Sequence, residues 1–215
     1  MAKQKRVQTA HEEQLNTLSH GITAIAAIGG LIILVWFGAK SEKEWSLISA
    51  ILFGLSLIAL YTFSSIYHGS KDPKNKKLFK ILDHCGIFLL IAGSYTPVLL
   101  ISIGGETGWL FVGIQWGMAL VGIILKIFFT GRFKGLSTAI YAVMGWVIIF
   151  KIDLVMELLS GPAFLLLAFS GMAYTLGIVF YTLDSRIKYG HFIWHLFVIA
   201  GSVFHYIMVV KYVLV

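Results

Sequence analysis

The sequence has little charge and a single cysteine, Cys85. Asp, Glu, Lys and Arg make up 13% of its 215 residues, whereas a soluble domain averages about 25%. This shortage excludes a globular surface in water, and the 58% of hydrophobic residues indicates an integral membrane protein. A lone cysteine excludes an intrachain disulfide, so the redox compartment stays open. The first fifteen residues are polar, and we expect no cleavable signal before the first apolar segment.

Acidic residues are scarcer than basic ones, and the formal net charge is +7. A basic excess can indicate a nucleic-acid partner. Here the basic residues lie in short stretches between apolar segments, where Lys and Arg set membrane topology. The sequence therefore predicts a membrane lipid partner and no nucleic acid.

Seven apolar segments have about the 20 residues that a helix needs to cross the hydrocarbon core. They are Leu18–Gly38, Ser46–Tyr67, Ile81–Ile103, Trp109–Thr130, Leu136–Phe150, Ala163–Leu183 and Phe192–Tyr212. The fifth is short and can continue through Lys151 to Leu158, and Pro97 is expected to kink the third. The spans use nearly the whole chain. We therefore predict an all-α protein with one domain over residues 1–215, a seven-helix transmembrane bundle preceded by a cytoplasmic segment, residues 1–17.

The distribution of Lys and Arg predicts the orientation. With seven spans, one side holds the N-terminus and the loops after spans two, four and six. Its basic residues are Lys3, Lys5, Arg6, Lys71, Lys74, Lys76, Lys77, Lys80, Arg132, Lys134, Arg186 and Lys188. The other side has Lys40, Lys43, Lys151 and Lys211. The positive-inside rule then places the N-terminus in the cytoplasm and the C-terminus outside.

Four ionisable residues lie just inside the ends of the apolar segments, all on the predicted cytoplasmic side. They are His68, Asp83, His191 and His195. Ionisable groups in a membrane are costly, and their presence indicates a functional site. Three imidazoles with a carboxylate form a familiar ligand set for catalytic zinc. Together these residues favour a zinc site in the inner leaflet.

Each of these residues, taken singly, has an ordinary structural alternative. The pair His191 and His195 can be a proton relay or a hydrogen-bonded helix contact. His68 can be a cation at a helix C-terminus, and Asp83 a charge at a helix N-terminus. Ser64, one turn before His68, can back-bond to its own helix or support a metal ligand. We expect His205 to be a buried hydrogen-bonding group, and give Cys85 and His84 no ligand role.

The order of these motifs resembles the hemolysin III branch of the superfamily of adiponectin and progestin receptors, called PAQR. It is more distantly similar to the alkaline ceramidases. The matching pieces are Glu13-x-x-Asn16-x-x-Ser19-His20, Ser64-x-x-x-His68, Asp83, Ser94-Tyr95-Thr96-Pro97 and His191-x-x-x-His195. The resemblance spans essentially the whole chain. The N-terminal segment is shorter than in the receptor members, which favours the bacterial hemolysin III group and a bacterial plasma membrane location.

The resemblance implies a zinc ion held by His68, His191 and His195. It also implies that Asp83 contacts the zinc directly or through its water, with Ser64 close by. The leading hypothesis is a zinc-dependent hydrolase of lipid amide or ester bonds, ceramidase-like, in which Asp83 and Ser64 are catalytic. The alternatives are a lipid sensor with structural zinc, a protein associated with cytolysis, and a transporter or proton channel. The sequence leaves the lipid and the oligomeric state open.

Overall fold

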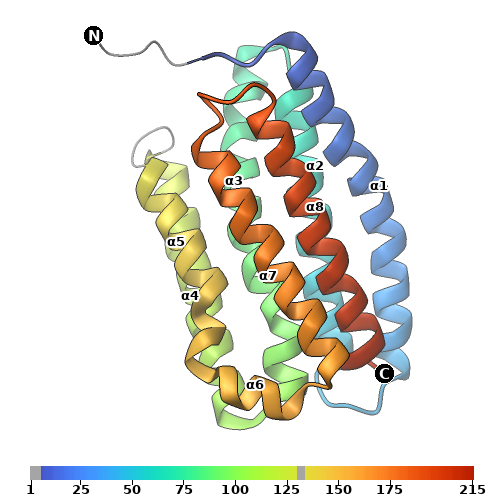
Figure 1. The fold of residues 1–215 in the computed structure, drawn as a ribbon. Coiled ribbons are helices and arrows are strands. Elements are labelled where there is room, and N and C mark those ends of the chain that lie inside the picture. Colours follow the sequence, from blue (N-terminus) through green and yellow to red (C-terminus); the bar gives the residue numbers. More distant parts are fainter. Residues whose placement is uncertain (1–5, 130–133) are drawn as a thin grey trace.

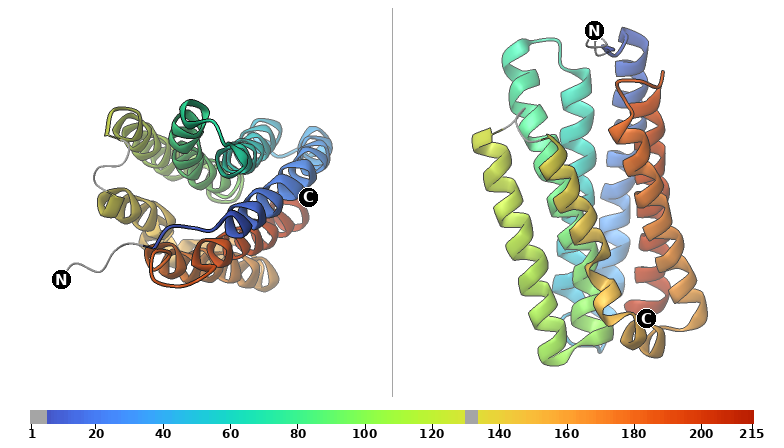
Figure 2. Two further views of the ribbon diagram at one scale, coloured as in Figure 1. Left: turned by 90° about the horizontal axis from the view of Figure 1, so that it is seen from above. Right: turned by 60° about the vertical axis from the view of Figure 1, so that its left-hand side comes forward.

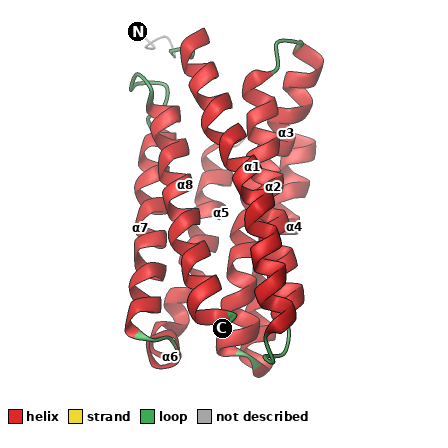
Figure 3. Cartoon of the chain, turned by 90° about the vertical axis from the view of Figure 1, so that its right-hand side faces the viewer, coloured by secondary structure: helices red, strands yellow, loops and turns green. Residues whose placement is uncertain are grey.

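The computed structural model describes residues 6–129 and 134–215. Helices dominate this part of the chain, and it contains no strand (Figure 3). The helices are α1 (Ala10–Lys40), α2 (Ser46–Gly69), α3 (Pro73–Pro97), α4 (Gly105–Phe129), α5 (Lys134–Trp146), α6 (Ile152–Leu158), α7 (Gly161–Thr182) and α8 (Gly190–Met208). Seven helical segments within these residues are long and apolar enough to cross a membrane. The predicted all-α class and the seven spans are confirmed.

The helices form a ring in chain order. Each span packs against the next, and α8 closes the ring against α1. The view from above in Figure 2 shows this order, with α1 and α8 side by side. In Figure 1 the start of α1 and the loops after α2 and α7 lie at one end of the bundle, and the C-terminus lies at the other. We call the first the N-terminal end. Residues far apart in sequence can therefore meet at one level of the ring.

The side chains of α1 show why the bundle needs a lipid environment. One face carries buried Asn16, His20 and Leu34. The other face exposes large aliphatic side chains such as Ile25 and Ile32, which are 73% and 67% exposed. A helix whose outer face is apolar and whose inner face is partly polar fits a membrane span, because lipid removes the penalty for apolar exposure.

Two helices begin well before the expected apolar spans. The first starts at Ala10 and not Leu18, because Thr9 and Glu12 form a capping box in which each side chain bonds the other's backbone N–H. The third starts at Pro73 and not Ile81, because the Asp72 side chain accepts from the N–H of Asn75 and proline suits the first turn. Both extensions are polar, so hydropathy alone does not reveal them.

Other sequence expectations concern helix irregularities. The fifth span does continue beyond its apolar part, through a 3₁₀ turn over Val147–Lys151 into α6. The third span changes after Pro97 into a π-helical segment, Val98–Ile103. Loss of the proline N–H accounts for this change in winding. The predicted end of span four at Thr130, the loop residue Arg132, and the lysines Lys3 and Lys5 lie outside the described residues.

Candidate metal centre

Helix α2 places His68 at the N-terminal end of the bundle. The helix buries one stripe of its surface, in which Tyr61, Ser64 and His68 follow one another at intervals of about one turn. His68 is 4% exposed. Its position one residue before the helix end lets the ring reach toward α8, which crosses the same level of the bundle.

The start of α8 is fixed by a contact from α1. Tyr189 precedes the helix with a φ of 61°, a left-handed conformation. Its backbone N–H donates to Glu12 Oε1 at 2.7 Å. Glu12 is itself 2% exposed and also accepts from Arg6. Because His191 follows two residues later, this bond helps to fix where the histidine stripe of α8 begins.

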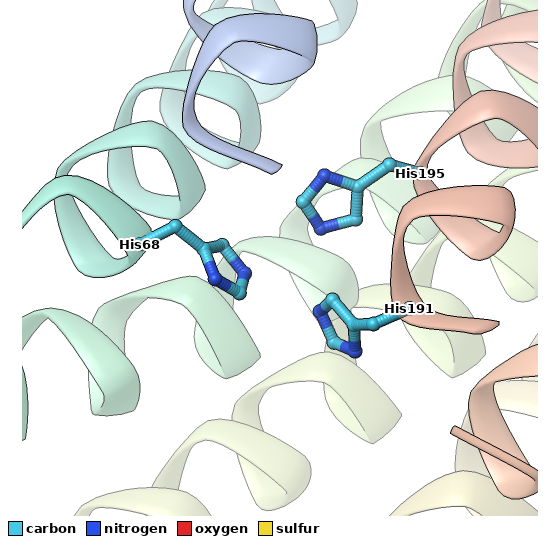
Figure 4. Close-up of side chains that lie close together, drawn as sticks. All are labelled: His68, His191 and His195. Carbon is cyan, nitrogen blue, oxygen red and sulfur yellow. The ribbon is translucent and has the colours of Figure 1, made fainter. Parts of the chain in front are cut away.

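The three predicted histidines meet at this level. The ring centroid of His68 lies 5.0 Å from those of both His191 and His195, which are 4.9 Å from each other. One potential ligand atom from each lies within 4.8 Å of the others. Figure 4 shows the rings of His191 and His195 projecting from α8 toward His68 on α2. The sequence prediction that these side chains converge is confirmed.

The ring nitrogens fit a metal ion. Each histidine has a partner at Nδ1: Glu13 for His68 at 2.6 Å, Asp184 for His191 at 3.4 Å, and Ser19 for His195 at 3.2 Å. Metal-binding histidines characteristically use their second nitrogen in this way. Nε2 of His68 is buried and has no hydrogen-bond partner. Since buried polar atoms are rarely left unpaired, the three histidines could hold a divalent ion.

Asp83 and Ser64 lie beside this cluster without joining its closest group. Asp83 is 9% exposed, and its Oδ2 lies 3.9 Å from Nδ1 of His84. Among the described residues, the group of ligand atoms within 4.8 Å contains the three histidines and not Asp83. The Ser64 hydroxyl is fully buried with no hydrogen-bond partner, so the back-bond to its own helix, one of the two alternatives for this residue, is not formed. Both residues are available to a ligand.

A cavity of about 540 Å³ links these residues. His68, His191, His195, Asp83 and Ser64 all line it. Its remaining wall is largely apolar and comes mainly from α3, α5, α7 and α8. This volume falls within the range of about 300–1,000 Å³ that is typical of small-molecule pockets. The histidine cluster thus opens on a space that can hold an apolar chain.

Three residues near the cluster were not among the predicted metal ligands or catalytic residues, although His20 belongs to the N-terminal motif. His20 is 2% exposed and stacks on His195 with centroids 3.6 Å apart, yet neither of its ring nitrogens has a partner. The sequence does contain a signal for Glu12, because Thr9-x-x-Glu12 is the pattern of a capping box. No sequence pattern indicates Asp184, because its contact with His191 depends on the conformation of the loop before α8.

The histidine deep in α8 belongs to a different environment. His205 is 5% exposed, and its Nε2 donates to the carbonyl of Ser94 at 2.8 Å. This confirms the prediction of a buried hydrogen-bonding group. Nearby, Ser202 accepts from the Tyr61 hydroxyl at 2.7 Å and lies 2.9 Å from that of Tyr174. These contacts join α2, α7 and α8 in the interior.

Fold and site together define a class: a multi-pass, all-α membrane protein with a buried three-histidine cluster at one end of a ring of helices. The chain belongs to the haemolysin-III related family, which matches residues 8–206. This is the hemolysin III group of the PAQR superfamily that the sequence motifs predict. Its bacterial relatives and its seven apolar helices identify it as a multi-pass protein of a bacterial cell membrane.

The relatives are similar over nearly their full length. Hemolysin-3 of Bacillus cereus is 43% identical over 98% of this chain and 95% of that protein. The Hemolysin-3 homolog of Bacillus subtilis is 40% identical over 95% of each. The monocyte to macrophage differentiation factor of Homo sapiens is 30% identical over 95% of this chain and 85% of that protein. No solved structure matches the chain.

Proposed function

We propose that the protein is a zinc-dependent hydrolase of lipid amide or ester bonds. The observation that carries the proposal is the convergence of His68, His191 and His195 on one wall of a largely apolar cavity. Their ligand atoms would hold the ion. Three protein ligands leave a coordination position open, the arrangement of catalytic rather than structural zinc. Bound zinc would supply Lewis-acid chemistry, polarising a carbonyl group and making water a stronger acid.

The chain's own residues would bind and orient the reactants. The apolar wall of the cavity suits an acyl chain, which would place its carbonyl near the histidines at the N-terminal end. Asp83, on the same wall, would hold a water molecule and accept its proton. The unpartnered hydroxyl of Ser64 would donate a hydrogen bond to the substrate. We assign Asp83 this base role because the three histidines form the close group without it.

The test measures metal and turnover together. Protein purified in detergent is analysed for bound metals, and its hydrolysis of fluorescent N-acyl and ester lipids is followed. His68→Ala, His191→Ala and His195→Ala are each expected to lose the metal and the activity. His11→Ala is the matched control, because His11 is exposed and lies outside the cluster. Undiminished hydrolysis by a metal-free histidine variant would contradict the proposal.

Cytolysis is the second candidate, and the names of the two Bacillus relatives favour it. The proposal of a hydrolase predicts that any lysis results from altered lipids. Leakage of a dye from liposomes is then expected to depend on the three histidines. Leakage that survives their simultaneous replacement by alanine would favour a pore that needs no metal.

A further inference from the structure

Glu13 links three helices at the N-terminal end of the bundle. It lies in the first turn of α1, and its side chain is 25% exposed. Oε2 lies 2.6 Å from Nδ1 of His68 on α2. Oε1 accepts from the Lys76 ammonium on α3 at 2.9 Å. Each carboxylate oxygen thus has a separate partner, and the glutamate is held from two sides.

The Glu13 contact determines which nitrogen of His68 carries the proton. An ionised carboxylate can accept hydrogen bonds but cannot donate one. The proton must then be on Nδ1, and in the neutral ring Nε2 presents its lone pair. That Nε2 is the buried atom without a partner. The contact therefore leaves the lone pair of this buried, unpartnered nitrogen free to bind a cation.

Lys76 strengthens this arrangement from the solvent side. Its ammonium group donates to the second carboxylate oxygen at 2.9 Å, which holds the carboxylate in place beside His68. The lysine side chain also passes over the ring of Tyr67, at 5.4 Å from the centroid. Lys76 lies in the first turn of α3. The orientation of His68 is thereby coupled to the start of the helix that carries Asp83.

The other two histidines have weaker supports. Ser19 donates its hydroxyl proton to the Asn16 carbonyl at 3.0 Å, so its oxygen accepts from Nδ1 of His195 at 3.2 Å, a contact that lacks the charge of Glu13. The Asp184 contact with His191 is longer, at 3.4 Å. Glu13 gives the shortest of the three contacts. Removing its charge should therefore affect metal binding more than removing the Ser19 hydroxyl.

We propose that Glu13, held by Lys76, is the positioning residue of His68, fixing both the orientation and the protonation of the ring that binds the metal. This inference rests on the proposed function, since it presupposes that the histidines bind a divalent ion. Glu13 touches neither the ion nor the substrate in this role. It acts through His68 alone.

The experiment compares Glu13→Gln with wild type in detergent. The glutamine keeps the shape but can offer an N–H₂ group to Nδ1, which would move the ring proton to Nε2. Zinc affinity is measured by competition with a chelator, and the absorption bands of bound Co²⁺ report the ligand geometry. We expect the affinity to fall about 10–100-fold, the range for lost outer-shell partners of metal ligands. The Co²⁺ bands should also change.

The controls separate positioning from folding. Glu106→Gln removes a similar charge at the exposed start of α4 and should leave affinity and spectrum unchanged. Lys76→Met should weaken zinc binding less than Glu13→Gln. Thermal unfolding of the metal-free Glu13→Gln and Lys76→Met proteins should be similar, because both lose the same ion pair, so the difference between their zinc affinities reports the positioning of His68. If Glu13→Gln fails to fold, Glu13→Asp, with a carboxylate one methylene shorter, is expected to fold and bind zinc more weakly.

Two failures can be told apart. If wild type binds zinc and Glu13→Gln, or Glu13→Asp in its place, binds it with equal affinity and the same Co²⁺ spectrum, the positioning role is overturned and the proposed function stands. If wild type binds neither zinc nor Co²⁺, the proposed function fails and the positioning role fails with it.

Discussion

At the residue scale, buried polar atoms fall into two groups. The Tyr61 hydroxyl donates to that of Ser202, and the His205 ring donates to a carbonyl of α3. These hydrogen bonds hold helices together. The side-chain polar atoms of Ser64 and His20 have no partner, although both residues are buried and line the cavity. An unpaired buried polar group costs about 1–3 kcal/mol. Under the proposed function the second group would meet a bound ligand, whereas the first stabilises the fold.

This distinction predicts opposite effects for two serine substitutions. Ser202→Ala should lower the free energy of unfolding by about 1–3 kcal/mol, because it leaves two tyrosine hydroxyls without that partner. Ser64→Ala should not lower it, because no hydrogen bond is lost. Ser64→Ala should instead reduce lipid hydrolysis. Denaturant or thermal unfolding in a fixed detergent measures the first effect. Equal destabilisation by both variants would contradict the separation of buried polar atoms into a stabilising group and an unpartnered group.

Asp83 gives a second test at this scale. Asp83→Asn keeps the size of the side chain but removes its ability to accept a proton. The variant should retain its metal, since the three histidines form the close group without Asp83. Hydrolysis should fall about 10²–10⁴-fold, the usual contribution of a general base. Loss of the metal together with the activity would show that Asp83 is a ligand, as direct coordination would require.

At the element scale, small residues set how closely α2 and α3 approach. A Cβ at Gly86 would lie 2.9 Å from the Leu60 Cα, a backbone atom that cannot move without shifting its helix. Gly177 is similarly close to the Trp194 ring on α8, with 2.9 Å to the nearest atom. By contrast, a Cβ at Gly113 would meet nothing within 4 Å. Close packing thus depends on particular glycines, which their number in the sequence does not identify.

Gly86→Ala is expected to push α3 away from α2. Overpacking of this kind costs about 1–3 kcal/mol, and Asp83, three residues earlier, would move with the helix. Both unfolding stability and hydrolysis should decline. Gly113→Ala, the control, should be neutral or stabilising by up to about 1 kcal/mol, because alanine favours helix more than glycine does. A fully stable and active Gly86→Ala variant would show that the two helices are less tightly packed.

At the scale of the whole molecule, the ring brings three distant stretches together. His68 and His191 are separated by more than half of the chain, yet they meet because α8 closes against α1, which packs on α2. Glu12 and Glu13 take part in this closure, one bonded to the start of α8 and the other to the end of α2. The first turn of α1 therefore holds together the two helices that carry the histidines.

Orientation in the membrane is a prediction at the same scale. The excess of Lys and Arg at the N-terminal end predicts that this end lies in the cytoplasm. In a Cys85→Ala background, Val7→Cys and Val215→Cys introduce thiols at positions that are 84% and 67% exposed. A membrane-impermeant maleimide added to intact cells should label Val215→Cys and not Val7→Cys. The reverse pattern would place the histidine cluster at the outer leaflet.

The sequence alone determined the class of protein, the seven spans and the histidines that converge. These follow from local properties: apolar length decides which segments enter lipid, and the cost of burying imidazoles there marks His68, His191 and His195 as exceptional. The helix starts at Ala10 and Pro73 were missed because those turns are polar.

Tertiary structure alone decided which side chains support the histidines and which atoms remain unpaired. The contacts of Glu13, Asp184 and Ser19 with the rings depend on how helices rotate and pack, and no spacing in the sequence encodes that rotation. The same holds for the cavity, whose walls come from segments across the chain. The local chemistry of the sequence indicates which residues are candidate ligands, whereas the closure of the helix ring brings them within reach of one another.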